Sequence, residues 1–373
     1  MVDEIPFFNY QHIYKKNSNE FKKIFNELGL RGAYILQKDL LSFEKNLQKF
    51  LNVKFALGVA DGTNAIINGL VACGIGFKDE VIIASHTYIA TAAAIKLVGA
   101  KPVFADIGND FLICPKSVET LITKKTKAIM PTQLNGRCCD MDKIMSIAKT
   151  NKLEVFEDSA QALGAKFKGK SAGTFGKFGT SSFYPAKLLG SFGDGGAIFT
   201  NNKKIFEKCR LYRDHGRNQD GQVVDWGTNS RLDNIQAAFL DFKLRHFLDE
   251  IKKRREIAGK YHEAFKDIEE LSLPPAPSDG KHFDVYQNYE LAAENRDNLR
   301  SYLFKKKIKT IIQWNGTPVH QFNKLGFKKS DNTHLVNTNL FFKKCLMLPM
   351  NTSLTDVQVQ RIIDTVIKFY RKK

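Results

Sequence analysis

From about residue 53 onward, short runs of apolar and β-branched residues alternate with stretches whose apolar residues recur at helical spacing. The short runs predict seven strands, at 54–59, 80–84, 101–106, 127–133, 153–157, 180–184 and 196–200. The stretches between them predict helices at 64–73, 89–97, 142–152 and 203–212. Strands that alternate with helices form βαβ units. The pattern therefore predicts an α/β fold with a mainly parallel sheet flanked by helices.

The pattern changes after residue 229, where a long helical period covers residues 230–268. The sequence then predicts a Pro-rich loop, a strand, a helix and a C-terminal helix, at 271–282, 286–292, 296–305 and from Thr355 onward. We therefore expect two domains. An N-terminal arm and a large domain occupy residues 1–235, and a smaller α/β domain occupies residues 236–373.

Composition indicates a filled globular core, with 43% hydrophobic residues and 29 Phe. No run approaches the ~20 apolar residues that a membrane-spanning helix needs, and the N-terminus does not resemble a secretory leader. The six Cys show no C-x-x-C or Cys/His spacing that would indicate a zinc site, so no metal is expected. We expect a cytoplasmic protein with reduced thiols and no membrane contact.

The net charge of +18 suits either of two partners. One is nucleic acid, which the basic run at 252–255 would favour, and the other is a substrate that carries a diphosphate. Basic residues are spread along the whole chain, and no aromatic-basic RNA-binding motif is present. We therefore expect no nucleic-acid partner.

The segment ADGTNA at 60–65 links a predicted strand to a predicted helix. The free N–H groups and the dipole of a helix start bind phosphate; Gly62 permits close approach, and Thr63 adds a hydroxyl. An ordinary helix N-cap explains the same residues equally well.

The segment VFEDSAQALGA at 155–165 puts Asp158 at a strand end, which is where ligands bind in open parallel sheets. The simpler alternative is that Asp158 or Ser159 caps the next segment.

Another segment, WGTNSRLDNIQAA at 226–238, precedes the long helical period. Asn229 or Ser230 could cap that helix.

The segment SSFYPAKLLGSFGDGG at 181–196 holds a single Lys among apolar residues, between Pro185 and a group of glycines. An apolar environment destabilises the ammonium and favours the free amine of Lys187, which can form a Schiff base. The alternative is a surface Lys whose stem covers apolar residues while its charge stays in water.

Together these segments resemble the DegT/DnrJ-type (StrS-like) sugar aminotransferases, a branch of the fold-type I, aspartate aminotransferase-like enzymes that use pyridoxal 5′-phosphate (PLP). The resemblance covers almost the whole chain. Its motifs are GTNA, SHTYIATAAAI, PTQLNG, EDSAQALGA, SFYPAK, GDGG, RDHGRN, GTNSRLDNIQAA, GTPVHQF and LMLPMNTSLT.

The resemblance implies a role for each matched residue. Lys187 forms the Schiff base with PLP and later moves protons, and Asp158 keeps the pyridine nitrogen protonated. Gln161 bonds to the 3-hydroxyl group, and Tyr88 stacks on the ring. The remaining cofactor contacts go to the phosphate and come from Gly62, Thr63, Ser182 and, in a homodimer with shared active sites, Asn229 of the second copy.

On the substrate side, the resemblance points to His320 and Tyr184. A structural His near the domain seam is the alternative for His320. One departure from the family is Gln133, which stands where many relatives carry a His, and we expect it to alter one wall of the pocket.

Lys187 also separates two reactions, because family members that remove a hydroxyl carry His at its position. The resemblance therefore implies amino transfer from L-glutamate, through the pyridoxamine form of the cofactor (PMP), to a nucleotide-linked keto sugar for glycan synthesis. The LLGSFGDGG ending resembles enzymes that act on a 3-keto carbon, which favours a dTDP-linked 3-keto-6-deoxyhexose. A UDP-linked 3-keto sugar, a 4-keto sugar, a PMP-dependent dehydratase and a PLP-binding regulator stay open as alternatives.

Overall fold

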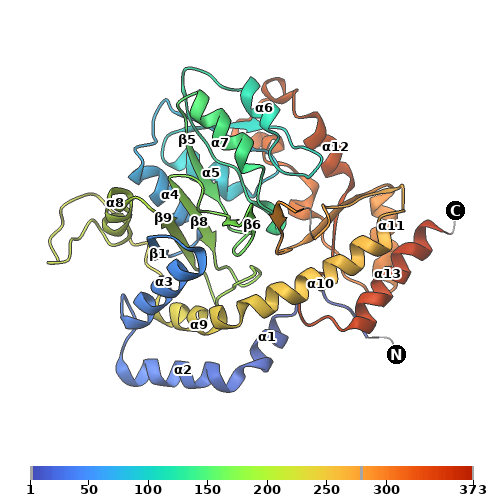
Figure 1. The fold of residues 1–373 in the computed structure, drawn as a ribbon, viewed down its shortest axis with the longest axis horizontal. Coiled ribbons are helices and arrows are strands. Elements are labelled where there is room, and N and C mark those ends of the chain that lie inside the picture. Colours follow the sequence, from blue (N-terminus) through green and yellow to red (C-terminus); the bar gives the residue numbers. More distant parts are fainter. Residues whose placement is uncertain (1–2, 278–279, 372–373) are drawn as a thin grey trace.

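The large unit of the chain is built on one seven-stranded sheet, seen in a computed structural model that describes residues 3–277 and 280–371 (Figure 1). The strands follow the order β1-β9-β8-β5-β4-β2-β3 across the sheet. Their bounds are β1 (Phe55–Val59), β2 (Glu80–Ala84), β3 (Lys101–Ala105), β4 (Thr126–Ile129), β5 (Glu154–Asp158), β8 (Phe178–Ser182) and β9 (Gly196–Thr200). β9 is antiparallel to β1 and β8, and the remaining neighbours are parallel. The predicted α/β fold with a mainly parallel sheet is confirmed.

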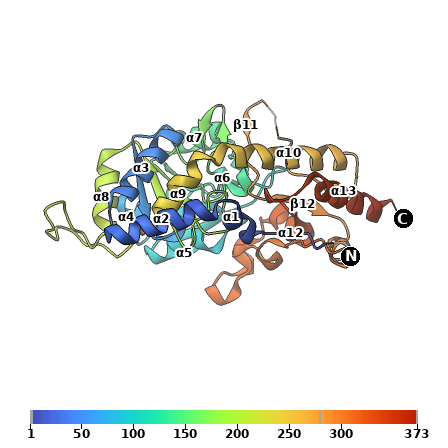
Figure 2. The ribbon, with the colours of Figure 1, turned by 90° about the horizontal axis from the view of Figure 1, so that it is seen from below.

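Helices cover both faces of this sheet, because alternate strand residues point to opposite sides. In β2, Ile82 belongs to one core, whereas Val81 and Ile83 belong to the other. The first core is covered by α3 (Lys38–Leu51), α6 (Pro115–Thr120), α7 (Met141–Thr150) and α9 (Asn234–Arg245). The second is covered by α4 (Gly62–Ala72), α5 (Ile89–Leu97) and α8 (Lys203–Arg213). Figure 2 shows α3 and α7 above the sheet and α5 below it.

A smaller unit has its own antiparallel sheet, β10 (Leu271–Ser272), β12 (Tyr289–Ala293) and β13 (Cys345–Leu348). Its core is closed by α10 (Phe247–Phe265), α11 (Arg296–Lys305) and α13 (Asp356–Tyr370). Ile5 pairs with Ile308 and is fully buried in this core, so the start of the chain packs on the smaller unit. The division predicted between residues 235 and 236 falls inside α9 and stays a prediction.

The remaining elements are short or lie at the edges. They are α1 (Tyr10–Lys16), α2 (Ser18–Arg31), α12 (Val336–Lys344), β6 (Lys166–Phe167), β7 (Lys170–Ser171) and β11 (His282–Phe283). No helix in the described part of the chain is long and apolar enough to cross a membrane.

Several strands and helices begin or end at residues other than those predicted, each for a local reason. β4 ends at Ile129, ahead of Pro131, which has no N–H for a sheet. β8 covers residues 178–182 instead of 180–184, because the chain turns where Lys187 N–H donates to the Tyr184 carbonyl. The helical period predicted at 230–268 is two helices that meet at His246. The C-terminal helix is confirmed, with Thr355 in a capping box.

Candidate active site

Four of the predicted site residues meet at one edge of the sheet. Asp158 and Ser182 are the last residues of β5 and β8, and Gly62 and Tyr88 follow the ends of β1 and β2. These four strands run in the same direction, so their carboxyl ends share an edge. Ligands bind at such an edge in open α/β sheets.

The start of α4 forms a narrow cradle against the end of β8. A Cβ atom on Gly62 would lie 2.9 Å from the Cβ of Ser182, so only glycine leaves room between them. The N–H groups of Gly62 and Thr63 belong to the first turn, where a helix offers no internal acceptor. The N-cap of this helix is Asp61, whose carboxylate accepts the N–H of Asn64 at 2.8 Å. The segment therefore supplies both a cap and an anion-binding cradle.

Asp158 is buried, with 5% of its surface exposed. Its Oδ2 accepts the hydroxyl of Thr91 at 2.6 Å, and its Oδ1 accepts the N–H of Ala160 at 3.1 Å. Thr91 in turn shares a hydrogen bond with Thr87. These bonds fix the plane of the carboxylate. The predicted capping contact is present at Ala160, and Thr91 is a partner that the sequence did not single out.

Lys187 lies in the loop after β8. Burial lowers the pKa of Lys187 to about 8, although the carboxylate of Asp158 acts in the opposite direction. At neutral pH a part of the population therefore holds a free amine, the form that adds to an aldehyde. The lowered pKa argues against the alternative of a solvated surface lysine. The described residues fit PLP: an amine of lowered pKa lies within electrostatic range of the buried Asp158 carboxylate, and a phosphate cradle lies along the same edge.

Gln161 has a fixed orientation, because its Oε1 accepts the N–H of Asn135 at 3.0 Å. Its Nε2 is therefore the end left to donate to a ligand hydroxyl. Tyr88 and Tyr184 are about half exposed, as expected for side chains that face a ligand. The ring of Tyr88 lies 6.2 Å from that of Trp314, a residue that the sequence analysis did not single out.

His320 lies where the large unit meets α12. Its Nδ1 shares a hydrogen bond with Ser85 Oγ at 2.7 Å, and its Nε2 with Asn339 Oδ1 at 3.0 Å. Burial lowers the pKa of His320, which favours the neutral ring. Both ring nitrogens are thus engaged within the chain. This geometry fits the structural alternative, and the substrate role stays a prediction.

Gln133 does not line the site, contrary to our expectation. Its side chain is fully buried and contacts Glu157 Oε2 at 2.7 Å and the N–H of Cys139 at 2.6 Å. Glu157 and Asp158 are neighbours in β5, so they point to opposite faces of the sheet. The replacement of the family's His by Gln133 therefore changes contacts on the face of the sheet opposite to Asp158.

Asn229 is exposed and closes a loop, residues 214–229, through a bridge with Asp214. This loop projects from the end of α8 at the left of Figure 1. Trp226 within it is 92% exposed. The capping alternative for Asn229 and Ser230 is wrong, since α9 begins at Asn234 with Asp233 as its N-cap.

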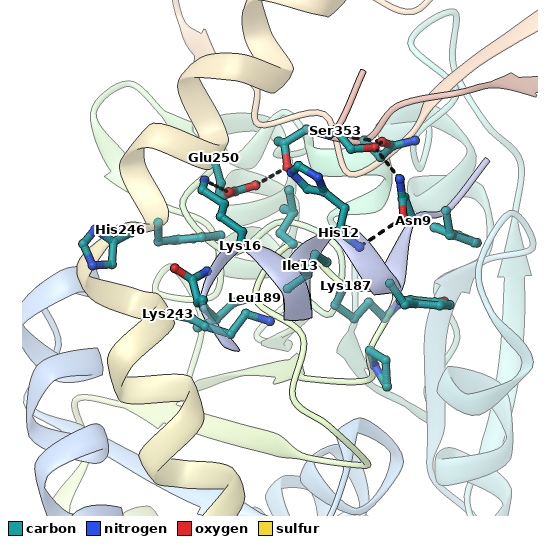
Figure 3. Close-up of a pocket in the computed structure, with 18 of the residues that line it drawn as sticks. Asn9, His12, Ile13, Lys16, Lys187, Leu189, Lys243, His246, Glu250 and Ser353 are labelled. Carbon is teal, nitrogen blue, oxygen red and sulfur yellow. Dashed lines mark hydrogen bonds and ion pairs between the residues drawn. The ribbon is translucent and has the colours of Figure 1, made fainter. Parts of the chain in front are cut away.

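A cavity of about 360 Å³ opens beside Lys187, between α1 and the junction of α9 and α10 (Figure 3). Its polar wall includes His12, Lys16, Lys243 and Glu250. Lys16 pairs with Glu250 at 3.5 Å, and Lys243 donates to the carbonyl of Gly190. Burial lowers the pKa of Lys243 to about 8.

Comparison with known proteins gives the same match along almost the whole chain. A model of the DegT/DnrJ/EryC1/StrS aminotransferase family matches residues 15–367. The chain is 36% identical over 372 residues to the pleiotropic regulatory protein of Geobacillus stearothermophilus, covering 98% of this chain and 99% of that one.

A second relative is dTDP-3-amino-3,6-dideoxy-alpha-D-galactopyranose transaminase of Aneurinibacillus thermoaerophilus, 34% identical over 366 residues with 98% and 99% covered. Among solved structures, DesV of S. venezuelae in complex with a ketimine intermediate superposes with a TM-score of 0.95. It is 33% identical, and 99% of both chains is covered.

Proposed function

Because the chain belongs to the DegT/DnrJ/EryC1/StrS aminotransferase family and is a PLP-dependent sugar aminotransferase, we propose that it transfers the amino group of L-glutamate to a dTDP-linked 3-keto-6-deoxyhexose. Three relatives are named as aminotransferases of dTDP- or UDP-linked sugars. The observation that carries the proposal is that the Lys187 amine, whose pKa is lowered by burial, lies within electrostatic range of the buried Asp158 carboxylate.

PLP supplies an electron sink that stabilises a carbanion next to the bound nitrogen. Lys187 would hold the cofactor through its Nζ, and its free amine would take the proton from the donor carbon. Asp158 would keep the ring nitrogen protonated, and the Thr91 hydroxyl, which donates to its Oδ2, holds the carboxylate in place for that contact. The same Lys187 amine returns a proton when the sugar carbon receives nitrogen.

The other residues orient the cofactor. The N–H groups of Gly62 and Thr63 and the hydroxyl of Ser182 hold the phosphate at the start of α4. Gln161 would donate through Nε2 to the 3-hydroxyl, and Tyr88 would cover the ring face. Contacts from these five residues would fix the ring relative to Lys187.

We propose a homodimer with shared sites. In this dimer Asn229, which is exposed on the projecting loop 214–229, contacts the cofactor phosphate of the second copy. The 92% exposure of Trp226 on that loop supports the idea, because large apolar surfaces left open on one chain favour association. We place this dimer in the cytoplasm, where nucleotide sugars are consumed.

The substrate assignment has two supports. The LLGSFGDGG ending at 188–196 resembles 3-keto enzymes, and the transaminase of A. thermoaerophilus is named for a 3-amino sugar carried on dTDP. A UDP-linked 3-keto sugar is the runner-up.

Mass spectrometry of the products from a panel of keto-sugar nucleotides with L-glutamate tests the proposal. We expect 2-oxoglutarate and one aminated sugar nucleotide from the dTDP-linked 3-keto substrate. A preference for a UDP-linked or 4-keto sugar would contradict the substrate, release of ammonia would indicate a dehydratase, and absence of 2-oxoglutarate would indicate a regulator.

A further inference from the structure

The loop that carries Lys187 is held from the smaller unit by the side chain of Gln287. Gln287 lies two residues before β12 and is 4% exposed. Its Nε2 donates to the carbonyl of Ala186 at 2.7 Å, and its Oε1 accepts the N–H of Leu188 at 2.7 Å. A single amide therefore bonds the residue before Lys187 and the residue after it.

The two hydrogen bonds of the Gln287 amide have the same pattern as those that a neighbouring β-strand makes. A strand partner also takes the carbonyl of one residue and the N–H of the second residue after it. A primary amide can do this because it offers a donor and an acceptor side by side without charge. The two bonds fix the peptide groups on either side of Lys187. They therefore fix the direction in which the Lys187 side chain leaves the backbone.

Gln287 is itself held from α10. The Nη1 of Arg254 donates to the carbonyls of Tyr286, Gln287 and Met350, at 3.1, 3.2 and 2.8 Å. Burial lowers the pKa of Arg254 to about 10, so its guanidinium stays charged at neutral pH. Charge-assisted bonds of this kind are stronger than neutral ones. The contacts run from α10 through Arg254 and Gln287 to the lysine loop.

We infer that Gln287 is a positioning residue for Lys187: it holds the amine at the sheet edge and ties its position to the smaller unit. The inference rests on the proposed role of Lys187. If the clamp is removed, the loop loosens and water reaches the amine. The pKa of Lys187 then rises from about 8 toward the value of a solvated lysine.

The test is a Gln287→Met variant, which keeps the length and volume of the side chain and removes both bonds. The measurement is the pH dependence of reductive methylation of Lys187 in the cofactor-free protein, followed on its peptide by mass spectrometry. We expect the apparent pKa to rise by at least about one unit, which means roughly tenfold less free amine at pH 7. In the PLP-loaded enzyme, kcat of the glutamate half-reaction falls while KM changes little.

Gln358→Met is the matched control. Gln358 also bonds a backbone N–H of the smaller unit, that of Thr355 at 3.0 Å, but it does so at the start of α13. We expect it to lower the melting temperature slightly and to leave the methylation profile of Lys187 unchanged. Gln287→Leu serves if the Met variant does not fold, because it also removes both bonds without adding a charge; its profile shifts in the same direction.

A wild-type methylation profile in both Gln287 variants, together with a wild-type half-reaction rate, would overturn the inference and leave Gln287 a packing residue. Failure of the proposed function has a different signature: the wild-type chain takes up no PLP at Lys187, whereas the methylation profile requires no cofactor.

Discussion

Replacement of Asp158 is expected to slow the reaction without preventing Lys187 from binding the cofactor. In an Asp158→Asn variant Lys187 still binds PLP, but the ring nitrogen loses the anion that keeps it protonated. We expect the glutamate half-reaction to slow by about 10²–10³-fold, the magnitude typical of a lost electrostatic contact in an active site. Stopped-flow absorbance of the loaded enzyme measures this rate.

An Asp142→Asn variant is the control for this change, since Asp142 pairs with Lys168 on the surface and exposed pairs contribute little. A half-reaction in Asp158→Asn as fast as in the control would show that the carboxylate has no part in the chemistry.

At the residue scale, the sequence predicted the reactive residues better than the hydrogen bonds that hold them in place. The matched motifs were enough to single out Lys187 and Asp158, and the structure brings them to one edge. Thr91 and Gln287 were missed, because each acts through a bond to a residue that lies 67 or 101 positions away along the chain. Gln133 was misplaced because sequence alone does not tell which face of the sheet it takes.

At the scale of elements, the loop 214–229 carries the proposed contact with a second copy. Gly216 lies at its base with φ +72°, and a Cβ atom there would come 1.7 Å from the carbonyl oxygen of Asp225. We expect Gly216→Ala to open the loop, shift the protein toward monomers and weaken PLP retention. Light scattering and the PLP content after gel filtration measure both effects.

The matched control is Gly221→Ala in the same loop. Gly221 also has a positive φ, +81°, but a Cβ atom there meets nothing within 4 Å. It should therefore cost only backbone strain, about 1 kcal/mol, and leave the dimer intact. Equal oligomeric states for the two variants would argue against the loop as the contact.

The elements themselves were predictable where short strands alternate with helices. Residues 80–84 and 89–97 match the structure at both ends, because each is bounded by a change of pattern. The split at His246 was not predicted, since the apolar period continues across it. The antiparallel β9 was predicted as a strand, but its direction depends on pairing with β1 and β8, which are far away in sequence.

At the scale of the whole molecule, shared sites can be tested by mixing two inactive variants. Lys187→Ala lacks the amine, and Asn229→Ala lacks the proposed contact to the second copy's phosphate. If Asn229 acts across the dimer, a mixed dimer contains one site with both residues intact. We expect activity to return to roughly a quarter of the wild-type sites after the two variants are dissociated and mixed in equal amounts.

The control is the same mixture without dissociation, which should remain inactive. If Asn229 acts within its own chain, subunit exchange creates no intact site. Activity after exchange that stays at the average of the two separate variants would contradict the shared-site arrangement.

The central claim is that the amine of Lys187 forms a Schiff base with PLP. Borohydride reduction of the loaded protein, followed by peptide mapping, tests it most directly. We predict one pyridoxyl group per chain, on the peptide that contains Lys187, and none in a Lys187→Ala variant. Label on another lysine, or no label at all, would contradict the account.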